Sequence, residues 1–364
     1  MKKISRRQFL TASGVVAAAG LLSACGSSSS SSSSSAAAGS QAVSSSAGAA
    51  KTRIGMVTDV GGVNDKSFNQ TSWEGLQALD PNEFEVSYLE SKTDADYTAN
   101  IEAFIDEGTD LIICVGYMLA NATKAAAKEY PDQLFAIIDD AANADLPNVA
   151  CLMFAQNEAS YLVGMVAGMM TESNTVGYVQ GMVSESMNQF GVGFIAGVKA
   201  ANADATVLQF NANTFSDAAV GSAAATDMIT KGADVIYAAA GGTGNGVIEA
   251  CKTNGVYAIG VDTDQSPLAP ETVITSAMKR VDAASQDISK AVREGTFEAG
   301  VHTYDMTNGG VDIAPTRDLL PADVIAAVEQ AKTDILAGTI VVPKNGDELA
   351  AALGEDAFTL DDAE

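Results

Sequence analysis

The feature that most constrains the fold is an alternation of short apolar runs and longer amphipathic runs that occurs twice along the chain. In the first half, β-rich runs separated by amphipathic stretches lie at residues 53–58, 85–89, 111–115 and 134–138. The same order begins again at Thr175–Val179. Alternation of this kind is typical of parallel βαβ units. The sequence therefore predicts an α/β protein with two similar lobes, each built on a doubly wound parallel sheet.

Matching motifs give this repeat its register. GADVIY in the second half is similar to GTDLII in the first, and YAIGVD is similar to FAIID. Phe68 and Phe190 lie 40 and 42 residues before the glycines that begin the first pair of motifs. Asp139 and Asp262 lie 31 and 30 residues after the same glycines. The spacings favour a true repeat over a chance similarity between two βαβ runs, and they pair Phe68 with Phe190 and Asp139 with Asp262.

The four paired residues lie where a ligand site is expected. In open parallel sheets the ligand crevice forms at the carboxyl ends of the strands, and all four follow a predicted strand end or begin the next helix. Two such edges facing each other make a cleft. We expect Phe68 and Phe190 to stack on opposite faces of one flat ring, while Asp139 and Asp262 accept hydrogen bonds from its substituents or hydroxyls. For either phenylalanine alone, the competing interpretation is a hydrophobic staple against the core.

A glycine-rich loop adds to this site. AAAGGTGNG at residues 238–246 follows an apolar run and opens a predicted helix, and Asp262 ends the next strand about twenty residues later. The arrangement resembles a dinucleotide-binding pattern but departs from G-x-G-x-x-G. Glycines let the backbone approach a ligand, and a carboxylate can accept two vicinal hydroxyls. Lys279 is a second candidate for a sugar or for orienting Asp262, with a solvated surface lysine as the alternative.

The N-terminus has the pattern of an export signal. Basic residues within 2–7 precede an apolar run at 10–24 that is too short to span a bilayer. LSAC, which ends at Cys25, resembles the lipobox of bacterial lipoproteins, in which the cysteine is lipidated, and SRRQFL resembles a twin-arginine export motif. Residues 26–50 are almost all Ser, Ala and Gly, which predicts a flexible tether. The alternative for Cys25 is an ordinary signal that ends in a chance cysteine.

Charge and residue usage exclude several classes of function. The first 24 residues carry four positive charges and no negative charge, so their removal changes the formal net charge from −26 to −30. A surface this acidic repels DNA, RNA and polyphosphates. The sequence has one histidine, His302, and no Cys/His spacing typical of zinc. We therefore expect no nucleic-acid partner, no metal and no cofactor, and histidine-based catalysis would depend on His302 alone.

Longer motifs carry a resemblance to a known family. DVGGVNDKSFNQTSWEGL, AAAGGTGNGV and IGVDTDQ resemble sequences of the basic membrane protein family of bacterial lipoproteins, whose best-known members are purine nucleoside receptors for ABC importers. The resemblance covers about residues 51–310. It implies a type I periplasmic binding protein fold, in which two lobes joined by three crossovers hold a nucleoside in the cleft between them.

The resemblance also implies roles for individual residues. Phe68 and Phe190 would stack on the base. Asn69 and Asp139 would form hydrogen bonds with its edge, and Asp262 and Lys279 would hold the ribose hydroxyls. Further hydrogen bonds around the pocket are implied for Asp59, Ser67 and Gly242. The resemblance implies a binding protein rather than an enzyme, so no catalytic residue is expected.

The sequence predicts the following organisation of the chain. The predicted segments are a signal peptide at 1–24, a lipidated Cys25 with its tether at 25–50, a first lobe at 51–155 and about 280–312, a second lobe at 156–279, and a C-terminal segment at about 313–364 that packs on the lobes. The expected location is the outer face of the bacterial cytoplasmic membrane, through a lipid anchor. The expected partners are a nucleoside and the permease and ATPase subunits of an ABC importer.

Rival interpretations remain at the level of the sequence. Asp262-Thr-Asp264 has the spacing of the paired aspartates in calcium-dependent nucleoside hydrolases, but no further acid follows before Glu271, so the metal cage is incomplete. A sugar receptor of the same fold is the stronger rival, because such proteins also stack aromatic rings on ligands and bind hydroxyls with Asp and Asn. A receptor that feeds a sensor instead of a transporter is a third possibility.

Overall fold

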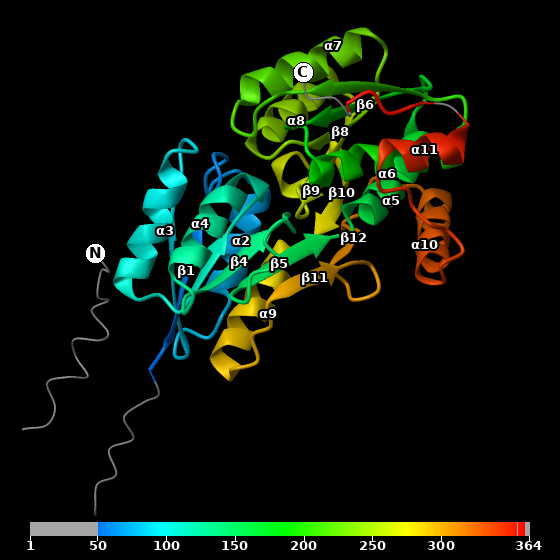
Figure 1. Ribbon diagram of the computed structural model, residues 1–364. Coiled ribbons are helices and arrows are strands. Elements are labelled where there is room, and N and C mark those ends of the chain that lie inside the picture. Colours follow the sequence, from blue (N-terminus) through cyan, green and yellow to red (C-terminus); the bar gives the residue numbers. More distant parts are fainter. Residues whose placement is uncertain (1–49, 355, 361–364) are drawn as a thin grey trace, which may run out of the picture. The chain divides into compact units, whose positions relative to one another are not determined.

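The structure is a computed structural model in which residues 50–354 and 356–360 are described. Within these residues the chain forms two six-stranded sheets (Figure 1). The strand orders are β11-β5-β4-β3-β1-β2 and β12-β10-β9-β8-β6-β7, and every neighbouring pair is parallel except β10 with β12. The strands are β1 (Thr52–Val57), β2 (Phe84–Leu89), β3 (Leu111–Cys114), β4 (Leu134–Ile138), β5 (Val149–Phe154), β6 (Thr175–Gln180), β7 (Thr206–Asn211), β8 (Val235–Ala239), β9 (Tyr257–Asp262), β10 (Val273–Lys279), β11 (Gly300–Tyr304) and β12 (Val311–Ile313).

The two sheets repeat one topology. The order β5-β4-β3-β1-β2 in the first sheet returns as β10-β9-β8-β6-β7 in the second. This confirms the predicted pair of similar, doubly wound parallel lobes. The first lobe is the first sheet with its covering helices, and the second lobe is the second sheet with its own. The predicted signal peptide, Cys25 and the tether up to residue 49 lie outside the described residues.

Both sheets are buried on both faces, and β3 shows how. Leu111 and Ile113 belong to one buried cluster, whereas Ile112 and Cys114 belong to another. Successive side chains of a strand point to opposite faces, so each face of the sheet has its own core, as expected of parallel sheets. In the first lobe the covering helices are α2 (Phe68–Gln77) and α9 (Val281–Glu294) on one face, and α3 (Asp96–Glu107) and α4 (Ala120–Glu129) on the other. In the second lobe they are α5 (Gln156–Met170) and α6 (Glu185–Ala201), opposite α7 (Ala218–Thr230) and α8 (Gly242–Asn254).

Within the described residues, the chain passes between the sheets three times. It leaves the first sheet after Phe154 at the end of β5, returns after Lys279 at the end of β10, and leaves again after Tyr304 at the end of β11. The last passage places β12 beside β10 in the second sheet. The predicted limits of the lobes, 51–155 with about 280–312 and 156–279, stay a prediction. Because β12 pairs with β10, it belongs to the second sheet.

Glycines allow α5 and α6 to pack at close range. A Cβ atom added at Gly193 would lie 2.2 Å from the carbonyl oxygen of Asn157, and one at Gly197 would lie 2.0 Å from that of Tyr161. Contacts this short cannot form, so a side chain at either position would push the helices apart. This tight pair matters for function because α6 carries Phe190.

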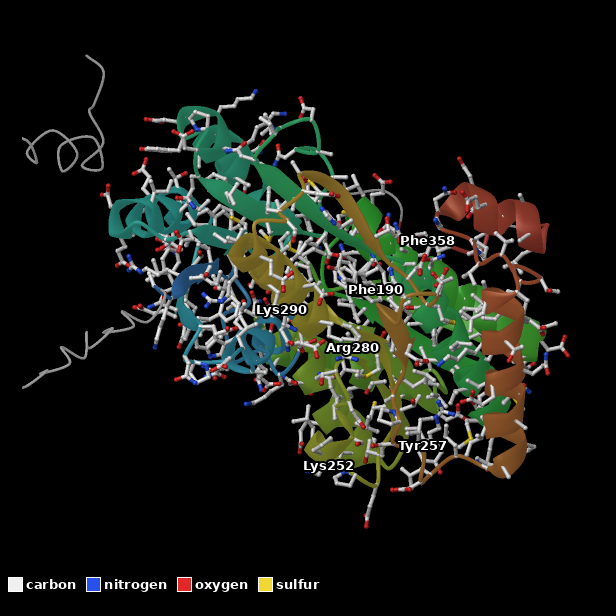
Figure 2. The ribbon with its side chains drawn as sticks, turned by 90° about the horizontal axis from the view of Figure 1, so that it is seen from below. Phe190, Lys252, Tyr257, Arg280, Lys290 and Phe358 are labelled. Carbon is white, nitrogen blue, oxygen red and sulfur yellow. The ribbon has the colours of Figure 1, made fainter. Side chains whose placement is uncertain are left out.

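The C-terminal segment packs on the second lobe. Helices α10 (Ala322–Leu336) and α11 (Gly346–Leu353) contact α5 and α6 respectively (Figure 1). Beyond them Phe358 is 3% exposed, and a Cβ at Gly191 would lie 2.6 Å from its ring. The side chain of Gln209 in β7 binds the backbone of Ala357 and Thr359 at 2.7 and 3.0 Å. Phe358 therefore supports α6 one residue from Phe190, and Figure 2 labels both rings.

Candidate functional site

A cavity lies at the carboxyl ends of strands from both sheets. Its lining comes from the residues that follow β1, β3 and β4 in the first lobe and from the ends of β8, β9 and β10 in the second. The beginnings of α2 and α6 and Phe215, between β7 and α7, also contribute to it.

Most of the predicted site residues line this cavity. Those that do are Asp59, Phe68, Asn69, Asp139, Phe190, Asp262 and Lys279. The other two lie beside it: the Ser67 hydroxyl donates a hydrogen bond to the Asp262 carboxylate, and Gly242 begins α8 directly after Gly241, which lines the cavity. The structure thus brings the predicted residues to one place, while their contact with a ligand stays a prediction.

The loop before α2 is ordered by an acid that the sequence motifs did not single out. Oδ1 of Asp65 accepts from the backbone N–H groups of Ser67 and Gln70 at 2.9 and 3.1 Å, and Oδ2 accepts from that of Asn69 at 2.8 Å. These are the N–H groups that a helix start leaves without partners, so Asp65 caps α2. The position of Asp65, three residues before the first helical residue, could have predicted this capping role from the sequence.

Asn69 links this cap to Asp59. Its amide nitrogen donates to Asp59 at 2.8 Å and to Asp65 at 3.0 Å, and its amide oxygen accepts from the Asp59 backbone at 3.3 Å. Both amide hydrogens are therefore used inside the loop. In this structure Asn69 holds the Asp59 carboxylate in place at the cavity wall.

Asp59 is held where its charge is poorly solvated. Burial is the main cause that raises the pKa of Asp59 from 3.8 to about 7, and the hydrogen bonds from Asn69 and the Gly61 N–H oppose the rise. A carboxyl whose pKa is higher in the folded state binds more protons there than in the unfolded chain. Its contribution to stability is therefore greatest below about pH 4 and is lost as the pH rises through about 7.

We expect Asp59→Asn to remove this pH dependence. The amide keeps the acceptor for Asn69 and Gly61 but carries no charge, so the variant should be more stable than the wild type at pH 8 and similar at pH 4. Urea unfolding across this pH range measures the difference. Asp132→Asn, which removes an exposed carboxylate, is the matched control. Equal stability of Asp59→Asn and the wild type at pH 8 would contradict the argument.

Lys279 brings a positive charge to the wall of the cavity. Among the described residues that line the cavity it is the only cation, and it is 1% exposed, so the alternative of a surface lysine is wrong. Its ammonium forms an ion pair with Asp139. The same nitrogen lies 4.9 Å from the ring centre of Phe68 and 5.4 Å from that of Phe190. Lys279 therefore contacts both rings that were predicted to stack on a ligand, within cation–π range.

The two repeat-related aspartates share an uncommon backbone conformation. Asp139 and Asp262 have φ values of 66° and 65°, in the left-handed region that non-glycine residues seldom adopt. Such strained residues cluster at functional sites. Burial raises the pKa of Asp262 from 3.8 to about 6, against the opposing effect of the nearby Lys279 charge. Oδ1 of Asp139 is buried and has no hydrogen-bond partner within the described residues.

Further hydrogen bonds join the two lobes beside the cavity. Asn245 in α8 donates to the carbonyl oxygen of Asp65 at 3.0 Å, and Gln265 donates to that of Lys66 at 2.8 Å. Together with the bond from Ser67 to Asp262, they fix the loop before α2 against the second lobe. The loop that carries Asp59 and Phe68 is thus also the part of the first lobe that contacts the second.

Several lining residues were not predicted. They are Asp65, Gly116, Tyr117, Met187, Phe215, Ala239, Ala240, Gly241 and Val261. Gly116 has φ of 108°, and a Cβ there would lie 3.2 Å from the Asp59 carboxylate. Gly116 follows β3 as Ala240 and Gly241 follow β8. The repeat could therefore have predicted that Gly116 lines the cavity. Phe215 and Met187 come from segments without a distinctive pattern.

The remaining candidate chemistries find little support in the described part of the chain. No group of three or more His, Cys, Asp or Glu side chains is placed to hold a metal ion there. His302 lies on β11, where its Nε2 is 2.9 Å from the carbonyl oxygen of Glu298. Over the same residues, no helix combines the length and the apolar character needed to cross a membrane.

Comparison with known sequences agrees with this geometry. Residues 52–346 match the family described as ABC transporter substrate-binding protein, PnrA-like, and residues 3–23 match the signal sequence of the twin-arginine translocation pathway, which indicates export. The chain is 38% identical over 314 residues to the CD4+ T-cell-stimulating antigen of Listeria monocytogenes, covering 80% of this chain and 88% of that one. It is 36% identical over 321 residues to the ABC transporter nucleoside-binding protein BmpA of Lactococcus lactis, covering 81% and 91%.

Solved structures show the same architecture. A solute-binding protein of an ABC transporter system from Aeropyrum pernix matches with a TM-score of 0.73 and 25% identity, over 83% of this chain and 96% of that one. A transcriptional activator of the comK gene from Bacillus halodurans matches with a TM-score of 0.68 and 25% identity, over 79% and 99%. These likenesses confirm the periplasmic binding protein fold. With most of its length matched by the family model, the chain belongs to the PnrA-like family of ABC transporter substrate-binding proteins.

Proposed function

We propose that this protein captures nucleosides, with a preference for purine nucleosides, between its two lobes and delivers them to an ABC importer. The observation that carries the proposal is the joint placement of Phe68 and Phe190 with Asp139 and Asp262 around one cavity. Two ring faces suit a flat heteroaromatic base. Two carboxylates suit the hydrogen-bond donors of its edge and of the ribose.

The available interactions are large enough for tight binding. Stacking of a base on an aromatic side chain contributes about 1–3 kcal/mol. A hydrogen bond to a charged group contributes about 1.5–3 kcal/mol. After the costs of ordering, two stacks and a bound diol support affinities from micromolar to nanomolar. Asp262 is the acceptor for the ribose hydroxyls, and Oδ1 of Asp139, which has no hydrogen-bond partner among the described residues, is the acceptor for donors on the base edge.

Two further observations favour a nucleoside over a simple sugar. The relative from Lactococcus lactis is named as nucleoside-binding. Trp73, the one tryptophan of the chain and the residue type that most often stacks on sugars, packs edge-on against Tyr88 with ring centres 4.8 Å apart. It is not among the residues that line the cavity.

The proposed location follows from the N-terminal sequence. Lipidation of Cys25 would anchor the exported protein to the outer face of the cytoplasmic membrane, where the tether lets the lobes reach the permease. Membrane-fraction recovery that is lost in Cys25→Ser supports this anchor. Recovery of the variant with the membranes to the same extent as the wild type would reject it.

A thermal-shift screen tests the ligand. The ligands are inosine, guanosine, adenosine, hypoxanthine, guanosine monophosphate, ribose and arabinose, since a ligand that binds only the native state raises Tm. We expect the largest rise with purine nucleosides and no such rise in Phe68→Ala. A rise with sugars alone, or with no nucleoside, would reject the proposed function and leave the family and the fold in place.

A further inference from the structure

The three connections between the sheets meet at one point. The backbone N–H of Ala155, in the first connection, donates to the carbonyl oxygen of Tyr304, at the start of the third, at 2.9 Å. The N–H of Arg280, in the second connection, donates to the carbonyl oxygen of Gly310, at the end of the third, also at 2.9 Å. Figure 2 labels Arg280 at the beginning of α9. If one lobe moves relative to the other, the backbone must therefore change conformation in segments that are hydrogen-bonded to one another.

The side chains at the ends of the same strands are also in contact. Phe154 and Tyr304 are directly paired in the register of β5 and β11, and their rings stack with centres 5.1 Å apart and planes 22° from parallel. The Lys279 ammonium lies 5.1 Å from the centre of the Phe154 ring. Tyr304, Phe154 and Lys279 thus form a continuous row, and each is the last residue of the strand that precedes one connection.

This row ends inside the cavity. Lys279 lines the cavity, whereas Phe154 does not. Phe154 is 4% exposed, so its ring is covered by protein on all sides. A cation over a desolvated aromatic face is held more strongly than one at an exposed site. The Phe154 ring is therefore a fixed support behind the one cation of the lining, among the residues that the structure describes.

We propose that Phe154 is a positioning residue of the binding site, which holds the Lys279 ammonium in place and couples it to the point where the three connections meet. The proposal rests on the proposed nucleoside-binding function. Phe154 acts through Lys279 and not by touching the ligand. A change in the connections that moves the Phe154 ring therefore moves the charge that faces the ligand.

A double-mutant cycle tests this role, with inosine as the probe and affinity measured by calorimetry. We expect Phe154→Leu, which keeps an apolar side chain but removes the ring face, to weaken inosine binding about 5- to 30-fold. In a Lys279→Gln background, which has no ammonium to position, the same substitution should change the affinity by less than about 2-fold. Phe104→Leu, a buried core substitution in α3, should lower Tm without changing the affinity.

The outcomes separate the possible failures. Coupling between the two substitutions supports the positioning role. An equal loss of affinity from Phe154→Leu in both backgrounds, or no loss in either, would overturn it, since a purely structural effect does not depend on the lysine. Absence of inosine binding by the wild type would instead reject the proposed function on which the inference rests.

Discussion

Lys279→Met should destabilise the protein by about 3–5 kcal/mol at neutral pH, which is the cost of breaking a buried ion pair by removing one partner. Methionine keeps the length and apolar packing of the lysine stem but leaves the buried Asp139 without its cation. Asp59 and Asp262 line the same cavity, and burial already raises the pKa of both. The Lys279 charge opposes the rise at Asp262, so the only cation among the described lining residues compensates Asp262 as well as Asp139.

Urea unfolding at pH 7.5 measures this loss. The matched variant is Lys279→Met combined with Asp139→Asn, which removes the uncompensated charge and should recover much of the stability. A loss below about 1 kcal/mol in the single variant would contradict the account. So would a double variant no more stable than the single one.

Asp262→Asn should move stability and binding in opposite directions. Since the pKa of Asp262 is raised from 3.8 to about 6, the folded state binds more protons than the unfolded chain, and stability falls as the pH rises through about 6. A rise of this size corresponds to on the order of 3 kcal/mol. At pH 8 the uncharged variant should therefore melt higher, by roughly 3–6 °C. Asparagine also tolerates the left-handed backbone at this position, so the substitution adds no strain.

Nucleoside affinity of the same variant should fall by roughly 10- to 100-fold, because hydrogen bonds from the ribose hydroxyls lose a charged acceptor. Tm without ligand and the inosine affinity, both measured at pH 8, check the two halves of the prediction. Asp132→Asn should change neither. A variant that melts lower and binds equally well would show that Asp262 supports the fold and does not hold the ligand.

Much of the fold could be predicted because the same order of strands and helices occurs twice in the sequence. The repeat of strand, helix and motif spacing predicted two parallel lobes, and the topology confirms them. Membership in a family of substrate-binding proteins confirms the prediction that the chain is not an enzyme. The match to a twin-arginine signal confirms the prediction of export.

The candidate site could be predicted where side-chain chemistry and position agree. Phe68 begins α2 and Asp262 ends β9, and the repeat pairs them with Phe190 and Asp139, which line the same cavity. Phe154 and Phe358 could not be found in this way. Each is an apolar residue in an apolar context, and its importance depends on what it meets in three dimensions: the Lys279 ammonium in one case and the close approach to Gly191 in the other.

Asp65 could not be assigned to the site for a different reason. An aspartate before a helix is expected to cap it, and Asp65 does so. Its second role, fixing Asn69 and through it Asp59, depends on side-chain hydrogen bonds that no spacing rule predicts.

Nucleoside binding is tested most directly by isothermal titration of the purified protein with inosine, set against separate titrations with hypoxanthine and ribose. We expect one site for inosine with a Kd between about 1 μM and 1 nM, and much weaker binding of either half alone, because the base and the sugar use different walls of one cavity. Absence of binding by inosine, guanosine and adenosine, with ribose or arabinose binding tightly, would contradict this expectation.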